Sequence, residues 1–315
     1  MKRILMTTAI AALLAGCGDG NPFDTNAAAN GNGDPNTDSN KRFLFDTAKF
    51  LTANQFTYDA ATDKISINNL PFDGVSASGG TFDNSGVVLP NGTITYRNAP
   101  AAGEDQYYAV ILRSPSGTGS LVGAVGTNAW RGFGYGGAYA ERPSSGLPPT
   151  RPATYRYQGN YAGVLVSRQT GGATNQIQLT EGTASLDVDL QDLDAGGSIR
   201  GRIINRQLYD VNGTARGALR PIILNSTTID ATTNNRTNAA TADTLHTGAT
   251  PATLAGTVAQ TGSWEGNFSG PNGEEIVGYV LIEGSLSDGD PNFAASPAPA
   301  VTGREIGGFI GVRLP

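Results

Sequence analysis

The second half of the chain alternates apolar and polar residues in short runs, and this two-residue period restricts the fold more than any other feature. Leucine and valine alternate with aspartate over residues 186–190, and isoleucine alternates with arginine over 199–203. Successive side chains of a β-strand point to opposite faces, so each run has one dry face and one wet face. No helical period of useful length interrupts the runs after Tyr155. The sequence therefore predicts an all-β fold.

These runs predict about eight antiparallel strands that close into a soluble barrel. Glycine lies inside several of the runs, and it relieves crowding where barrel strands bend. The large apolar faces at 186–190, 264–268 and 276–282 predict an interior filled by side chains, because a barrel of about eight strands has little more room than that. Charged outward faces and the lack of aromatic girdles argue against a transmembrane barrel. The expected strands are 155–167, 176–190, 198–208, 217–229, 254–259, 262–269, 275–286 and 303–313.

Two long stretches interrupt these strands. Residues 225–253 are rich in Thr, Asn and Ala, and residues 285–303 are rich in Pro and Ala. Loops longer than about 12–15 residues are usually functional or disordered. We expect both stretches to be loops, and we expect that deletion of residues 232–245 leaves the fold intact.

The first half of the chain is also β-like. Residues 56–67 predict a hairpin, and the run YYAVIL at 107–112 predicts a buried strand. Three prolines within 144–152 mark a boundary. We therefore expect a β-rich, handle-like domain at 42–150, followed by the eight-stranded barrel at 155–315.

The N-terminus, MKRILMTTAIAALLAGC, combines a basic start with a short apolar run. The run is too short to cross a bilayer, which needs about 20 apolar residues, and it is typical of a secretory signal. It ends in Leu-Ala-Gly-Cys, which resembles the bacterial lipobox, whose cysteine receives lipid after the signal is cleaved. We expect residues 1–16 to be a lipoprotein signal peptide and Cys17 to be lipidated. Several acyl chains anchor a protein stably, whereas one alone is marginal.

The residues after the lipobox predict a tether and a destination. Residues 17–41 hold one aromatic residue, no Val, Ile or Leu, and many Asn, Asp and Gly, so they predict a disordered tether between lipid and folded chain. Gly18 follows Cys17 directly, where the signal for retention at the inner membrane has Asp. We therefore expect a lipid-anchored protein of the outer membrane of a Gram-negative cell.

Composition excludes several kinds of chemistry. One cysteine and one histidine, His246, leave no internal disulfide and no zinc site with several Cys or His ligands. The net charge of −6 argues against nucleic acid as a partner. Neither a G-x-S-x-G nor an H-E-x-x-H motif is found. We expect a binding protein that is not an enzyme and that needs no cofactor or metal.

Residues 262–278, GSWEGNFSGPNGEEIVG, resemble a signature of the transferrin-binding protein B-like bacterial surface lipoproteins. In that family a G-x-F-x-G-P-x-x-x-E-x-x-G run joins two neighbouring strands of an eight-stranded C-terminal barrel, and the neisserial factor H-binding protein is similar in plan. Residues 157–163 and 304–311 are similar to family segments as well. We expect Phe268 to point into the barrel and the small Gly278 to let a neighbouring side chain cross the interior.

This resemblance implies a lipid-anchored binding protein of the outer membrane that captures a protein or a haem- or iron-type ligand. The partners it implies are the membrane, through the N-terminal lipid, a host haem- or iron-carrying protein, and a TonB-dependent outer-membrane transporter. The alternative is a structural envelope lipoprotein without a soluble ligand.

Aromatic side chains are typical of binding hot spots, and one glycine-rich stretch, residues 130–139, concentrates them. We hypothesise that these aromatic residues contact the ligand, with packing in the core as the other interpretation. The four residues are Trp130, Phe133, Tyr135 and Tyr139.

Overall fold

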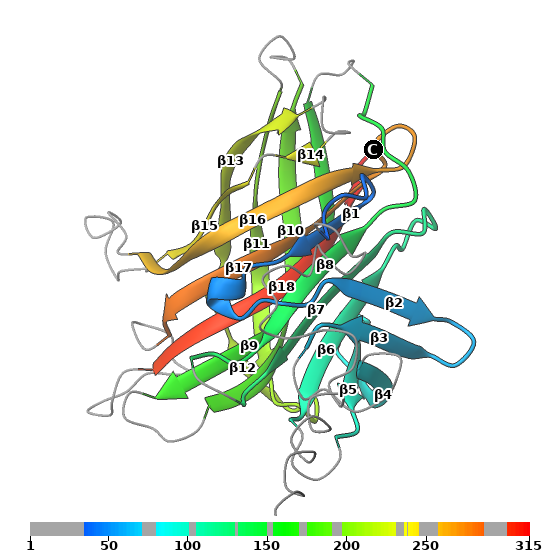
Figure 1. Cartoon of the computed structure of the whole chain (residues 1–315). Coiled ribbons are helices and arrows are strands. Elements are labelled where there is room, and N and C mark those ends of the chain that lie inside the picture. The colour runs from blue at the N-terminus through cyan, green and yellow to red at the C-terminus, as the bar shows by residue number, and fades with distance from the viewer. Residues whose placement is uncertain are drawn as a thin grey trace, which may run out of the picture.

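The computed structural model describes most of the chain beyond the N-terminal segment, and it consists of two antiparallel sheets (Figure 1). The described residues are 35–70, 80–100, 105–129, 132–149, 154–169, 175–190, 197–230, 236–237, 239–245, 258–286 and 301–315. Within them no helix is long and apolar enough to cross a membrane. The prediction of an all-β fold is confirmed.

The N-terminal sheet has eight strands in the order β1-β8-β7-β6-β5-β4-β3-β2. The expected hairpin at 56–67 is β2–β3, and the expected buried strand at 107–112 is β6. The strands are β1 (Lys41–Leu44), β2 (Gln55–Asp59), β3 (Lys64–Asn68), β4 (Gly80–Val88), β5 (Ile94–Asn98), β6 (Tyr107–Arg113), β7 (Leu121–Thr127) and β8 (Gly136–Glu141), with a 3₁₀ helix, η2 (Thr47–Lys49), after β1.

This sheet curls until its edge strand β2 packs against β8, next to the other edge strand β1. Phe56 on the edge strand β2 stacks on Tyr139 of β8, with ring centroids 5.2 Å apart and planes 1° apart. Phe43 on the other edge strand, β1, lies 5.0 Å from the same tyrosine ring. The inner face of the curl is a single apolar core that includes Ile65, Ile67, Phe82, Tyr96, Tyr107 and Ile111. The N-terminal sheet is thus a nearly closed barrel of eight strands with its own core.

The C-terminal sheet closes into the predicted eight-stranded barrel. Pairing of β18 with β9 and of β11 with β13 joins the two ends of the sheet, so the ring runs β9-β10-β11-β13-β15-β16-β17-β18. The strands are β9 (Thr154–Gln169), β10 (Asn175–Asp189), β11 (Ser198–Tyr209), β12 (Ala215–Ala218), β13 (Ile222–Asp230), β14 (Arg236–Thr237), β15 (Ala240–Leu245), β16 (Val258–Ser269), β17 (Glu275–Ser285) and β18 (Val301–Arg313).

Side chains fill the barrel, as the apolar faces predict. The interior core contains all the large residues expected there, Leu186, Val188, Leu190, Trp264, Phe268, Ile276, Val280 and Ile282. A methyl group at Gly278 would collide with the Phe309 ring, so this glycine does let a neighbouring side chain cross the interior. The indole nitrogen of Trp264 donates to the carbonyl of Asn225 at 3.0 Å.

One polar layer crosses this interior. Arg206 and Glu305, 2% and 1% exposed, form an ion pair inside the barrel. The hydroxyls of Tyr161 and Thr180 donate to the same carboxylate at 2.7 and 2.8 Å. Because a buried charge is costly unless it is paired and hydrogen-bonded, the four side chains form one interdependent unit.

The barrel corrects our expectation for residues 225–253. This stretch, expected to be a loop, contains the end of β13 together with β14 and β15, and β15 pairs with both β13 and β16. Residues 258–269, which span the end of one expected strand and the whole of the next, are the single strand β16, and residues 254–257 lie outside the described residues. Deletion of 232–245 would remove the strands that close the barrel, so the expectation that it leaves the fold intact is wrong. Residues 287–300 of the other expected loop lie outside the described residues.

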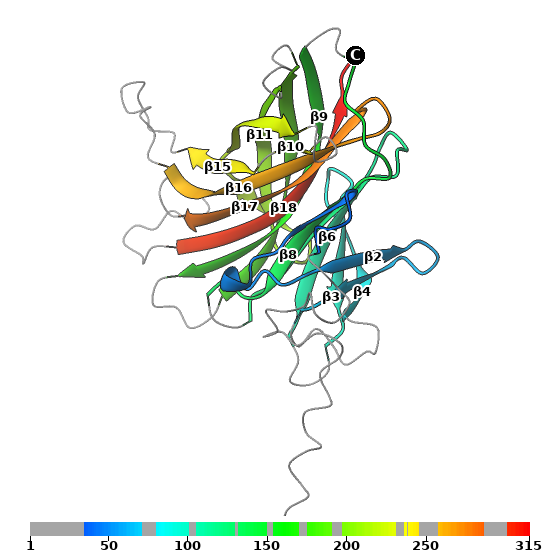
Figure 2. The same ribbon diagram turned by 45° about the horizontal axis from the view of Figure 1, so that its top comes forward.

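The outer face of β6–β8 packs against the barrel wall formed by β9, β17 and β18 (Figure 2). The face of β18 that carries Ile306 and Ile310 belongs to this outer wall. Gly308 lies between them, and a methyl group there would collide with Val122 of β7. Glycine at this position therefore allows the sheet and the barrel to approach closely.

We predict that Ala242→Asp prevents closure of the barrel. Ala242 on β15 is fully buried in the barrel core. An unpaired carboxylate there lowers the free energy of unfolding by at least about 3 kcal/mol. Thr241→Asp places the same charge on the exposed face of the same strand. Urea denaturation of both variants checks the prediction, and equal midpoints would show that β15 is not part of the barrel.

Candidate functional site

The structure separates the aromatic residues proposed as ligand contacts. Tyr139 is 0% exposed and lies between the rings of Phe43 and Phe56, and Tyr135 is 7% exposed within the same core. These two tyrosines pack in the core, and Phe133 is half-buried. The sequence pattern alone leaves both interpretations open, because glycine neighbours do not distinguish an aromatic residue in the core from one on the surface. The other two candidates, Cys17 and Trp130, lie outside the described residues, as does His246.

Phe133 belongs to a small surface where the N-terminal sheet meets the barrel. The guanidinium of Arg304 on β18 lies 5.3 Å from the centroid of the Phe133 ring. It also donates to the carbonyl of Lys49 at 2.7 Å and to Glu283 at 2.9 Å. Phe50 is 38% exposed, and the edge of its ring meets Tyr135 at 5.2 Å. We call this surface the seam patch, formed by Lys49, Phe50, Phe133 and Arg304.

A shallow hollow of about 440 Å³ adjoins the seam patch and shares Lys49 with it. Asp243 and Glu283 bring two carboxylates to its lining. The accessible part of the seam patch is the ring of Phe50, the half-buried Phe133 and the exposed Lys49, because Arg304 is only 6% exposed. Aromatic residues are among those enriched at binding hot spots. The other lining residues come from β15 and β16: Thr241, Thr261, Gly262 and Ser263.

A second candidate site lies at the open end of the curled N-terminal sheet. A cavity of about 490 Å³ separates β2 from the turn between β6 and β7 and from the ends of β1 and β8. Phe56, 5% exposed, lines this cavity, and Leu121 is half-buried beside it. We call this cavity the mouth, lined by Lys41, Phe56, Thr57, Tyr58, Arg113, Ser114, Gly117, Gly119, Ser120, Leu121 and Glu141.

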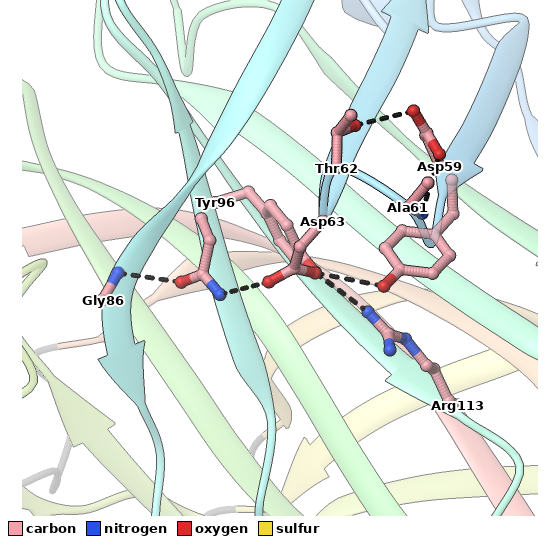
Figure 3. Close-up of polar contacts among 9 residues, drawn as sticks. Asp59, Ala61, Thr62, Asp63, Gly86, Tyr96 and Arg113 are labelled. Atoms are coloured by element: carbon pink, nitrogen blue, oxygen red, sulfur yellow. Dashed lines mark hydrogen bonds and ion pairs between the residues drawn. The ribbon is translucent and has the colours of Figure 1, made fainter.

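Asp63 organises one wall of the mouth (Figure 3). It lies in the β2–β3 turn with φ +51°, a left-handed conformation that Asp and Asn tolerate better than most residues. Its carboxylate accepts hydrogen bonds from the Tyr96 hydroxyl at 2.8 Å, the Asn84 amide at 2.6 Å and the Tyr58 hydroxyl at 3.1 Å. Three neutral donors from β2, β4 and β5 thereby converge on one turn residue.

Arg113 on β6 completes this wall. Its guanidinium lies over the Tyr58 ring, 3.8 Å from the centroid. Nη2 donates to the Tyr96 hydroxyl at 3.0 Å and reaches Asp63 at 3.4 Å (Figure 3). The Arg113 side chain is still 41% exposed. A flat, fixed and accessible guanidinium therefore borders the mouth.

These contacts shift the pKa values of the groups involved. The hydrogen bond from Asn84, followed by that from Tyr96, lowers the pKa of Asp63. Burial, and then the hydrogen bond to Asp63, raises the pKa of Tyr58, and the same two causes raise that of Tyr96. At neutral pH the aspartate is therefore ionised, and both tyrosines remain neutral donors to it.

The far wall of the mouth is held by the barrel. The turn between β6 and β7 places a hydroxyl at every second position, and Ser114 and Ser116 each donate to Glu275 of β17 at 2.6 Å. Thr118 donates to the same carboxylate, which is 0% exposed, and Ser120 contacts the Ser269 hydroxyl at 2.7 Å. These hydrogen bonds to Glu275 and Ser269 connect the barrel motif at 262–278 to the N-terminal sheet.

The sequence alone does not reveal the mouth. Its polar residues come from strands that are far apart in the chain, so no spacing connects Lys41, Asp63, Arg113 and Glu141. The alternating hydroxyls of SPSGTGS at 114–120 are the one signal that could have indicated a shared acceptor.

Comparison with solved structures finds similarity to a transferrin-binding protein and to a haemoglobin receptor. No family model and no curated protein matches this chain. A transferrin-binding protein B double mutant from Haemophilus parasuis is 15% identical with a TM-score of 0.38, over 82% of this chain and 44% of that one. The haemoglobin receptor HpuA from Kingella denitrificans is 16% identical with a TM-score of 0.33, over 72% of this chain and 63% of that one. This chain therefore spans less than half the length of that transferrin-binding protein.

We predict that Asp63→Asn destabilises the chain in a pH-dependent way. Asparagine tolerates the left-handed backbone but lacks the charge. Because the pKa of Asp63 is lowered by folding, its contribution is fully present above the unfolded value of about 3.9 and is lost as the pH falls through the folded value. The difference in melting temperature between wild type and variant should be constant near neutral pH and shrink below about pH 4. A difference that is the same at pH 3 and pH 7 would contradict this role.

Proposed function

We propose that this protein is a lipid-anchored binding protein of the outer-membrane surface, not an enzyme, that captures a protein carrying haem or iron. The filled barrel is the observation that carries this proposal. Trp264, Phe268 and the Arg206–Glu305 pair lie inside the barrel. These side chains occupy the space that a small ligand would need. Ligand contact is then made by outer surfaces, and the seam patch offers the aromatic and charged residues for it.

The sequence at Cys17 supports the anchor. A basic start, a short apolar run and the only cysteine of the chain at the end of Leu-Ala-Gly-Cys are the parts that lipidation requires. Residues 17–41 then connect the lipid to β1. A surface-held capture protein would pass its cargo to an outer-membrane transporter, the second partner in this proposal.

We predict that Cys17→Ser abolishes anchoring. Serine lacks the thiol that forms the thioether, so the variant should remain unprocessed and should not be labelled by a radioactive fatty acid. Membrane fractionation and mass spectrometry of the N-terminus check this. Normal processing and membrane retention of the variant would show that the chain is not a lipoprotein.

We predict that the mature chain, immobilised without its lipid, binds at least one of three probes: haemin, haemoglobin or transferrin. Phe50→Ala combined with Phe133→Ala should weaken that binding at least about tenfold, because aromatic residues supply much of the energy of an interface. Val88→Ala is the matched control, since Val88 is 61% exposed on β4, away from the seam patch. Biolayer interferometry measures all three proteins.

Two outcomes contradict the capture function. If no probe binds, the structural envelope lipoprotein becomes the better interpretation. If a probe binds equally well to the folded double variant, capture occurs elsewhere than at the seam patch.

A further inference from the structure

We propose that the mouth of the N-terminal sheet is a second binding site, which takes the carboxylate of a small organic acid with an apolar body. The mouth is formed by β1, β2, β6 and β8, whereas the seam patch lies at the β8–β18 junction, so this site goes beyond the capture function proposed above. Its ligand class follows from the shape, the charge and the rigidity of the cavity.

The shape of the mouth fits the apolar body of such an acid. Its volume of about 490 Å³ lies within the range of roughly 300–1,000 Å³ that small-molecule sites occupy. Phe56 lines it, with its ring fixed against Tyr139. Leu121 and the Tyr58 ring extend this apolar surface. These three side chains form the apolar part of a lining whose other side chains are polar or charged.

The cations of the mouth supply the groups that would bind a carboxylate. Lys41 and Arg113 are the two cations of the lining, and Glu141 is its one carboxylate. Lys41 lies 3.8 Å from Glu141, a loose pair whose side chains are 38% and 35% exposed. Asp63, behind Arg113, lies 3.4 Å from its guanidinium and balances its charge. The Arg113 side chain is still 41% exposed, and a guanidinium can bind a carboxylate through two parallel hydrogen bonds.

The walls of the mouth are already in place before a ligand arrives. Arg113 is held over Tyr58, and the turn at 114–120 is hydrogen-bonded to Glu275 of the barrel. A rigid site avoids the entropic cost of ordering side chains on binding. The geometry therefore favours a site that does not need to close around its ligand.

The test compares each acid with its uncharged amide. Isothermal titration of the mature chain with phenylacetate and phenylacetamide should give at least about tenfold tighter binding of the acid. Arg113→Gln should remove this preference, whereas Arg97→Gln, an exposed arginine of the same sheet, should retain it. A peptide with a free C-terminal carboxylate, compared with its C-terminal amide, shows whether the site also accepts a chain end.

A second variant covers the case in which Arg113→Gln does not fold. Lys41→Gln leaves the Asp63 hydrogen bonds intact and should reduce the preference for the acid at least about threefold. The proposal is overturned by equal affinity for acid and amide in both ligand pairs, by no saturable binding of any of the four up to about 10 mM, or by a preference that persists in the folded variants of Arg113 and Lys41. Because haemin, haemoglobin and transferrin are not used, failure here leaves the capture function standing.

Discussion

The packing of β6–β8 against the barrel wall is the interaction on which the rest of the structure depends. Three glycines make it possible, because a methyl group at Gly308 would collide with Val122, one at Gly136 would come within 3.0 Å of Ile306, and one at Gly126 within 3.1 Å of Val164. Interiors are packed as densely as organic crystals, so a gap of even one methyl group along this wall would lose many contacts. The glycine content thus serves close approach of two sheets as well as bends within the barrel.

Buried polar groups then fix how the two sheets are joined. Arg142, 1% exposed, donates to the carbonyls of Phe268 and Ser39, and burial lowers its pKa to about 10, so it stays charged at neutral pH. Glu275 makes the matching contact in the opposite direction, as a barrel carboxylate that accepts from N-terminal hydroxyls. Apolar packing tolerates more than one arrangement of two surfaces. A buried charge needs its partner, because its loss costs several kcal/mol. These two residues therefore specify one arrangement of the sheets.

The parts of the fold that could be predicted are those with large residues at alternate positions. The strands around Leu186, Trp264 and Ile276 have such residues, and so the barrel, its filled interior and the inward Phe268 follow from the pattern. Strand β15 could not be predicted in this way. It places Ala242 in the interior opposite Gly262, where the neighbouring Trp264 supplies the bulk that β15 lacks. The sequence of β15 itself has no strand pattern, because the strand is specified by the neighbouring strands with which it pairs.

The candidate sites follow the same rule. Tyr139 has the residue type of a hot spot, but its position on β8 turns it toward Phe56 and into the core. Sequence reasoning can identify an aromatic residue, yet its exposure depends on the curl of a sheet whose strands are distant in the chain. The mouth forms because that curl brings β2 toward β1. The β6–β7 turn borders the mouth because its serine hydroxyls are hydrogen-bonded to Glu275 of the barrel. A change in the barrel at Glu275 would therefore act on the N-terminal site, even though the two lie in different sheets.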